Sequence, residues 1–248
     1  MDNNSMTPEA LAKVLFLHET WLDGSGNGAR ADLGVANLSG LNLTGFNLAG
    51  ANLAGANLNG TECLRANFTG ADLGGADLSV ADFSEAILCG ADLSGANLME
   101  SNFRLANLNR ANLFEACLRR ATLNPASLIG AILLRADLED VNLSGAVLSE
   151  ANISSTNLEN AILFEASLRG ANLSYSNLNG ANLCGAKLIG ANLSQASLCW
   201  AHLNEADLMD ADLSGANLRK ADLRGAVLVG VNLRDVDLSE AETYGVIR

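Results

Sequence analysis

The chain has 248 residues, of which 28 are acidic and 15 are basic, so its formal net charge at pH 7 is −13. This acidic balance argues against direct nucleic-acid binding, because phosphates repel negative charge. The sequence contains no run of 18 or more apolar residues, so it predicts no membrane-spanning helix.

The first 30 residues are predicted to contain a disordered start, at residues 1–6, followed by a helix. Thr7-Pro8 suits a helix N-terminus, and Leu11, Val14 and Leu15 follow at helical spacing. The glycine-rich stretch 23–28 ends the pattern. We interpret the helix as a cap on the repeats that follow, since the open end of a repeat stack exposes its core. A separate partner-binding helix is the alternative.

Residues 31–240 consist of 42 consecutive five-residue units without an insertion or deletion. The third position is Leu in 37 units, the first is Ala in 33, and the second is Asp or Asn in 29. Positions one and three have strand spacing and point the same way, whereas position two points outward. Positions four and five carry turn residues. A chain that bends identically every five residues must coil, which predicts a solenoid.

The register of Ala71-Asp72-Leu73 and Ala211-Asp212-Leu213-Ser214-Gly215 resembles the pentapeptide repeat proteins. This resemblance implies an all-β solenoid, namely a right-handed quadrilateral β-helix with four units per coil. The third residue would fill the core beside the first. Dividing 42 units by four gives about ten and a half coils. If so, residues twenty apart stack on one of four walls.

The fourth wall, which begins at Phe46, departs most from the repeat. Several of its second and fourth positions are apolar where the other walls are polar. Grouped apolar residues on a solvent-facing wall indicate a protein contact, although fourth positions could instead tuck into the corners. The candidate interface comprises Ile87, Ile129, Val147, Ile189, Met209, Val227 and Val229.

Charge is unevenly distributed along the repeats. Two acidic bands, at residues 31–100 and 136–215, flank a basic girdle of five arginines. The resemblance includes family members that inhibit gyrase by mimicking DNA, and the acidic rod favours such a function here. The basic girdle argues against it. The girdle consists of Arg104, Arg110, Arg119, Arg120 and Arg135.

Residues 241–248 are predicted to be a short C-terminal tail or lid. Relatives that inhibit gyrase dimerise through this end, so the resemblance suggests a homodimer here, through this end or through the apolar wall. A monomer with a small lid is the alternative. The candidate end-to-end contact comprises Tyr244, Val246 and Ile247.

Nothing in the sequence predicts catalysis, a cofactor or a metal. His18 and His202 lie far apart and join no Cys/His cluster, and carboxylates on a convex wall lack a cleft. The five scattered cysteines indicate free thiols and, with no leader pattern, a cytoplasmic protein. A bacterial source is implied by the family resemblance alone. We therefore predict a non-enzymatic protein-binding or scaffold rod with an unknown partner; the alternative is a DNA mimic that modulates a type II topoisomerase.

Overall fold

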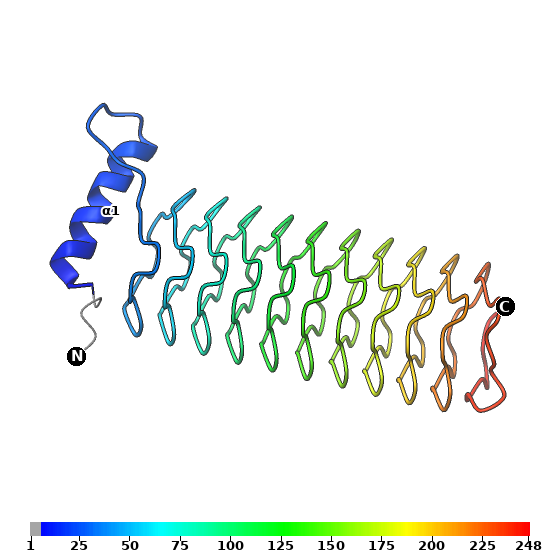
Figure 1. The fold of residues 1–248 in the computed structure, drawn as a ribbon. Helices are drawn as coiled ribbons and strands as arrows, with labels where there is room; N and C mark the ends of the chain where they lie inside the picture. The colour runs from blue at the N-terminus through cyan, green and yellow to red at the C-terminus, as the bar shows by residue number, and fades with distance from the viewer. Residues whose placement is uncertain (1–5) are drawn as a thin grey trace.

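The computed structural model describes residues 6–248, which form a straight rod with a helix at its N-terminal end (Figure 1). Of the six residues predicted to be disordered, the first five lie outside the described residues. Met6 donates its backbone N–H to the Asn37 carbonyl over 3.2 Å. The chain is thus anchored to the first coil before the helix begins.

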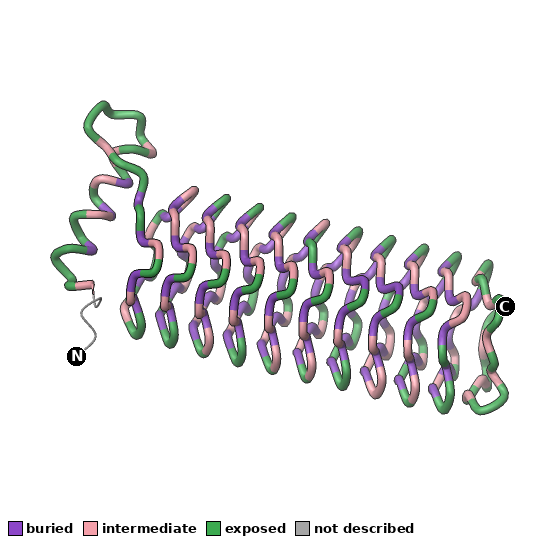
Figure 2. Tube along the Cα trace, in the orientation of Figure 1, coloured by how far each residue is buried: buried purple, intermediate pink, exposed green. Residues whose placement is uncertain are grey.

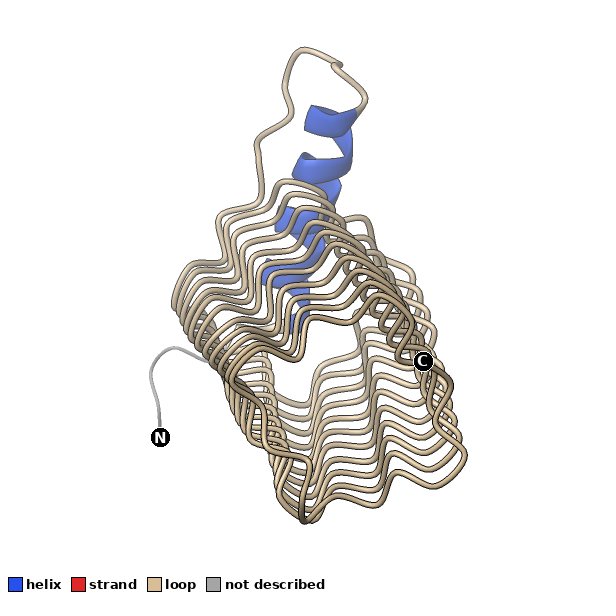
Figure 3. Cartoon of the chain, turned by 90° about the vertical axis from the view of Figure 1, so that its right-hand side faces the viewer, coloured by secondary structure: helices blue, strands red, loops and turns tan. Residues whose placement is uncertain are grey.

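The helix α1 spans Pro8–Leu22, as the sequence predicts. The Thr7 hydroxyl accepts a hydrogen bond from the Ala10 N–H at 3.2 Å, and Pro8 occupies a first-turn position that needs no donor. Leu11 and Leu15 are buried against the first coil. Seen along the rod, α1 lies across its far end (Figure 3), where it covers core side chains.

The unit at residues 51–55 shows how the repeat satisfies its backbone. Asn52 N–H bonds the preceding coil at the Ala31 carbonyl, and Leu53 and Gly55 N–H groups bond the next coil. Ala51 N–H closes a turn onto the Leu48 carbonyl. One donor remains, the N–H at position four. It reaches the Asn52 side-chain Oδ1 at 3.1 Å, which explains why position two is Asp or Asn.

The pairing between coils has a constant period of twenty residues. Parallel bridges join Asp32 to Asn52 and continue with the same offset to Val227 and Ile247. Four units therefore complete one turn, and the view along the axis shows a four-sided outline (Figure 3). We number the walls by their first units: the first begins at Ala31, the second at Ala36, the third at Leu41 and the fourth at Phe46.

The core is a column of first- and third-position side chains, seen as buried stripes in Figure 2. Most third-position leucines and first-position alanines are fully enclosed. Three phenylalanine rings replace third-position leucines in the N-terminal half of the column. The Phe83 ring centroid lies 5.4 Å from that of Phe68 and 5.0 Å from that of Phe103. Phe83 and Phe103 are stacked, whereas Phe68 is tilted against Phe83. The column thus accommodates rings where they contact one another.

The fifth position turns nearly every corner with a positive φ, whether or not it is glycine; Pro125 and Glu240 are the exceptions. Val80 adopts φ 61° although it is β-branched and exposed. Such a backbone conformation costs a non-glycine residue about 1–2 kcal/mol, and asparagine tolerates it better. Val80→Asn is therefore expected to raise the free energy of unfolding by about 1 kcal/mol, measured by urea denaturation. Met99→Asn, beside a corner but without positive φ, should bring no gain.

Residues 241–248 continue the coil and do not fold across its end. Glu242 bridges Asp222 and Ile247 bridges Val227, in register with every earlier turn. The predicted tail or lid is thus replaced by a further partial coil, because the residues at 241–248 still fit the five-residue pattern. The C-terminal end of the column has no cover among the described residues.

Candidate functional site

Side chains at position two form ladders along the rod. The Asn52 Nδ2 donates to Asp32 Oδ1 at 2.7 Å, and the same contact joins Asn112 to Asp92 and Asn232 to Asp212. Each oxygen also accepts the N–H two residues later, as Asp212 does from Ser214. These donations, that from Ser214 first, lower the pKa of Asp212. The stacked Asn and Asp residues therefore have a structural role, since they bond one another and the backbone of the corners.

The fourth wall is where this ladder fails most often. Asp or Asn occupies position two in 10 of 11 units on the first wall, but in only 4 of 10 on the fourth. Where it is missing, the fourth-position N–H loses the acceptor at position two of its own unit, and an apolar or basic side chain often replaces the carboxylate or amide. The fourth wall therefore differs from the others in hydrogen bonding as well as in polarity.

All seven residues of the predicted apolar patch lie on this wall, because their numbers share its twenty-residue register. Four of them are exposed and three are half-buried, so none belongs to the core column. The exposed members are Ile87, Ile129, Met209 and Val229; the half-buried members are Val147, Ile189 and Val227.

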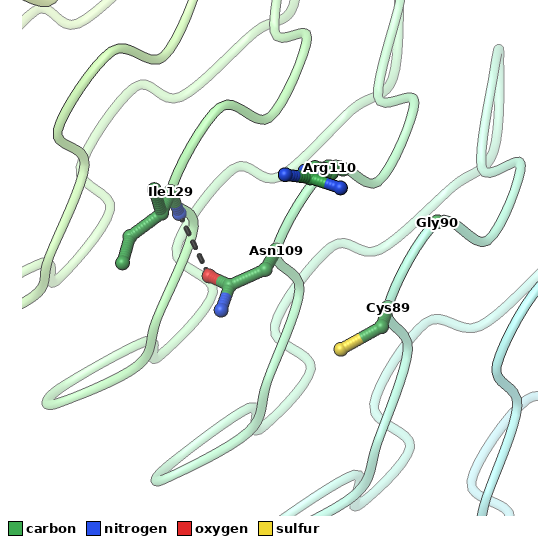
Figure 4. Close-up of a pocket in the computed structure, with 5 residues that line it drawn as sticks. All are labelled: Cys89, Gly90, Asn109, Arg110 and Ile129. Carbon is green, nitrogen blue, oxygen red and sulfur yellow. Dashed lines mark hydrogen bonds between the residues drawn. The ribbon is translucent and has the colours of Figure 1, made fainter.

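A hollow of about 450 Å³ opens on the fourth wall beside Ile129 (Figure 4). Cys89, Gly90, Asn109, Arg110 and Ile129 line it. Asn109 takes over the role of the missing ladder residue: its Oδ1 accepts the Ile129 N–H at 2.8 Å and the Ser127 hydroxyl at 2.7 Å. The hydrogen bond that replaces the missing ladder contact thus joins two of the residues that line the hollow, Asn109 and Ile129.

Asn109→Ala is expected to destabilise the protein by about 1–2 kcal/mol, because two donors lose their acceptor together. Thermal unfolding followed by circular dichroism measures this. Asn204, also at a fourth position, accepts a bond from the Cys184 thiol at 2.8 Å but none from a backbone N–H. Asn204→Ala should therefore cost clearly less, and equal losses would contradict the assigned role of Asn109.

The predicted basic girdle is largely neutralised. Arg119, Arg120 and Arg135 pair with Glu139, Glu100 and Glu115, each twenty residues away, at 2.8, 3.5 and 3.4 Å. Arg110 and Arg104 have no ion pair among the described residues. The girdle is therefore a set of vertical ion pairs between neighbouring coils, with few free charges.

Within the described residues, the C-terminal end of the column is an apolar cross-section that no other segment covers. The candidate residues there diverge: Val246 packs against the core, whereas Tyr244 and Ile247 are exposed on the third and fourth walls. The end itself is made of core-position side chains left half-covered, and Val246 is the one predicted contact residue among them. They are Val231, Leu233, Val236, Leu238, Ala241 and Val246.

Reactive chemistry has little support in residues 6–248. No three His, Cys, Asp or Glu side chains there are grouped so as to hold a metal ion. All five cysteines are free. Cys63 occupies a core position that is leucine in most units, and burial raises the pKa of its thiol far above the usual value. Lys220 Nζ lies 4.6 Å from the centroid of the Trp200 ring, a cation–π contact. Among the described residues no helix is long and apolar enough to cross a membrane, and α1 has only 15 residues.

Comparison with known proteins agrees with this architecture. The family model described as pentapeptide repeats matches residues 36–75, 66–104, 106–145, 135–163, 166–204 and 206–242. The crystal structure of HetL, a pentapeptide repeat protein involved in heterocyst differentiation regulation from the cyanobacterium Nostoc sp. strain PCC 7120, is 36% identical to this chain. The alignment covers 92% of this chain and 93% of HetL, with a TM-score of 0.40. No curated protein matches the chain.

Two further solved structures are similar over part or most of the chain. A pentapeptide repeat protein from the Arabidopsis thaliana thylakoid lumen is 32% identical, covering 48% of this chain and 70% of its own, with a TM-score of 0.27. Full-length QnrB1, a plasmid-mediated fluoroquinolone resistance protein, is 21% identical over 83% of this chain and 90% of its own, with a TM-score of 0.24. The four-walled repeat column defines a β-helical solenoid. The chain belongs to the pentapeptide repeat family, which implies that this β-helix is right-handed.

Proposed function

We propose that this protein is a cytoplasmic, non-enzymatic binding rod of about ten and a half coils, whose fourth wall contacts a protein partner. The observation that carries the proposal is the apolar patch on that wall. Its exposed members occupy positions that elsewhere hold ladder carboxylates, amides or turn residues. Isolated exposed apolar residues are ordinary, but a group on one wall of a charged protein is typical of a contact surface.

Three further observations support parts of this proposal. Its free cysteines suit a reducing compartment. The relative HetL, 36% identical to this chain, is involved in regulating differentiation, which supports a regulatory binding role. The walls are convex and rigid, so they offer a template for a partner and no enclosed site for a reaction.

Photo-crosslinking tests the wall. A benzoylphenylalanine placed at Ile189 or Met209 is expected to yield a covalent adduct in extracts of the native host, whereas one at Ser194, on the first wall, should not. Ile189→Asp with Val229→Asp should remove both the adduct formed from the Met209 position and any partner retention. Ser194→Asp with Ser214→Asp is the matched control on the first wall. Full retention after the fourth-wall changes would contradict the proposal.

The second proposed contact is a homodimer through the open C-terminal end. Two such ends would cover each other's half-exposed core side chains, among them Leu233 and Leu238. Light scattering is expected to give a dimer mass for the native chain and a monomer mass for Leu238→Asp. A monomer in both cases would reject this contact and leave the fourth wall as the interface.

The alternative function is a DNA mimic that modulates gyrase. The net charge of −13 and the straight rod support it. Carboxylates such as Glu100, Glu115 and Glu139 are paired with arginines, however, which reduces the negative surface. A gyrase supercoiling assay decides: neither inhibition nor protection at tens of micromolar protein would remove this function.

A further inference from the structure

Three neighbouring backbone donors on the fourth wall point to no acceptor. Position two of these units is Val147, Ser167 and Lys187, so the ladder oxygen is missing in three consecutive coils. Within residues 6–248 no hydrogen bond uses the N–H of Ser149, Arg169 or Ile189. We call these three N–H groups the donor row.

No other wall has such a row. On the third wall the Phe164 N–H also lacks an acceptor, but its neighbours Ser144 and Cys184 donate to Asn142 and Asn182. Isolated donors of that kind are readily hydrated. Three in line, about 4.8 Å apart because this is the spacing of hydrogen-bonded coils, present a continuous strip of positive partial charge.

Side-chain charge reinforces the strip. Arg169 and Lys187 lie on the same coils, and Arg110 lies further toward the N-terminus on the same wall. None of the three makes an ion pair within residues 6–248, in contrast to Arg119, Arg120 and Arg135 on other walls. Between residues 106 and 190 the fourth wall carries these three cations and one carboxylate, Glu150, and its next carboxylates, Asp207 and Asp210, come after Lys187. In this acidic protein, the middle of the fourth wall therefore has a net positive charge and is lined by apolar side chains.

The geometry of the wall selects the secondary structure of a partner. Backbone groups at positions one, two, three and five already bond between or within coils, as at Leu128, Gly130 and Leu148, so an added strand finds no regular ladder to extend. Carboxylates on a helix at spacings of three and four residues rise by about 4.5 and 6 Å, close to the 4.8 Å repeat. Two consecutive strand residues on one face are about 6.7 Å apart and lose register sooner.

We propose that the donor row, with Arg110, Arg169 and Lys187, binds an acidic amphipathic helix of a partner protein. The helix lies along the rod: its Asp or Glu side chains accept from the donor row and the cations, and its apolar stripe packs on Ile129, Val147 and Ile189. A bulky residue of the helix can enter the hollow beside Arg110. This inference rests on the proposed function of the fourth wall and adds the chemistry of the partner.

Synthetic peptides test the charge selectivity with the full chain. The probe is a fluorescein-labelled 18-residue amphipathic helix with a leucine stripe flanked by glutamates; otherwise identical peptides carry glutamine or lysine in place of glutamate. Fluorescence anisotropy is expected to show at least tenfold tighter binding of the acidic peptide, weakening at high salt because charges are screened. No detectable binding at about 100 μM would overturn the inference. The Kd would then exceed about 100 μM, which corresponds to a binding free energy weaker than about −5.5 kcal/mol.

Two variants locate the binding. Arg169→Glu with Lys187→Glu is expected to weaken the acidic peptide at least tenfold. Lys220→Glu with Arg234→Glu makes the same change in net charge on other walls and should stay within twofold.

Val147→Asn with Ser167→Asn restores ladder oxygens that occupy the Ser149 and Arg169 N–H groups without changing charge, and should also weaken binding. Thr122→Asn with Ile162→Asn is its matched control on the third wall.

The outcomes separate this inference from the function on which it rests. If the fourth-wall variants and their controls bind the acidic peptide equally, the donor row is not a helix site. The crosslinks from Ile189 and Met209 would still report on the wall as an interface. If Ile189→Asp with Val229→Asp also leaves the crosslink from the Met209 position intact, the proposed function falls as well. Equal binding of single-stranded DNA and the acidic peptide would overturn the helix specificity.

Discussion

Phe83→Ala is expected to lower the free energy of unfolding by about 3–5 kcal/mol. The ring is fully buried and has an aromatic neighbour on either side, Phe68 and Phe103. The backbone around it is fixed by bonds to both neighbouring coils, so the walls cannot close over the space that alanine leaves. The loss therefore combines the transfer of the ring to water with the cavity that remains. Urea denaturation followed by circular dichroism measures it.

Two controls sharpen this result. Phe83→Leu should cost much less, because leucine fills the same third position in most units and restores most of the volume. Phe164→Ala removes a ring that is 43% exposed and should cost under about 1 kcal/mol. A loss below about 1.5 kcal/mol for Phe83→Ala would mean that the column collapses around small side chains.

Much of the fold could be predicted from the five-residue period. The inward direction of positions one and three, the turn residues at four and five, and the helix at Pro8–Leu22 follow from spacing and capping alone. The period of twenty came only with the family resemblance, because no local pattern determines how many bends close a coil. Once that number is known, the ion pairs of Arg120 with Glu100 and of Arg135 with Glu115 can be read directly from the sequence.

The site was predictable only in part. The apolar members of the fourth wall could be identified from the sequence, but the donor row depends on which N–H groups the backbone leaves over, and that requires the complete hydrogen-bond pattern. A usable signal did exist. Asn109 precedes Ser127 by 18 residues, and Asn179 precedes Ser197 likewise, with the same side-chain bond at 2.7 Å. Asparagine at position four can therefore replace a missing ladder residue in the next coil.

The cap on the N-terminal end depends on a neutral histidine. His18 is fully buried, its ring stacks on Trp21 with centroids 5.4 Å apart, and its Nδ1 accepts the Ala31 N–H at 3.0 Å. The proton of the neutral ring must then sit on Nε2, which has no hydrogen-bond partner among the described residues. Burial lowers the pKa of His18, with Arg30 acting in the same direction and the Ala49 carbonyl and Glu19 opposing.

Acidification is therefore expected to release the cap. The imidazole of the unfolded chain takes up a proton near pH 6.5, whereas the folded one does so only at lower pH. The stability contributed by neutral His18 is thus complete above about pH 6.5 and is lost as the pH falls toward the folded-state pKa. In a Trp200→Phe background, Trp21 fluorescence should change over this range, before carboxylates with lowered pKa such as Asp212 and Asp222 begin to protonate.

His18→Asn makes this prediction specific to one atom. The asparagine Oδ1 stands as many bonds from Cα as the histidine Nδ1, so it can accept the Ala31 N–H but cannot titrate. Its Trp21 signal should be flat between about pH 5 and 7, with the cap retained. His18→Leu fills the space without an acceptor and should lose about 1–3 kcal/mol at every pH, since the Ala31 N–H is then buried unpaired. A pH profile in His18→Asn identical to that of the native chain would assign the transition to another group and would leave the cap insensitive to acid.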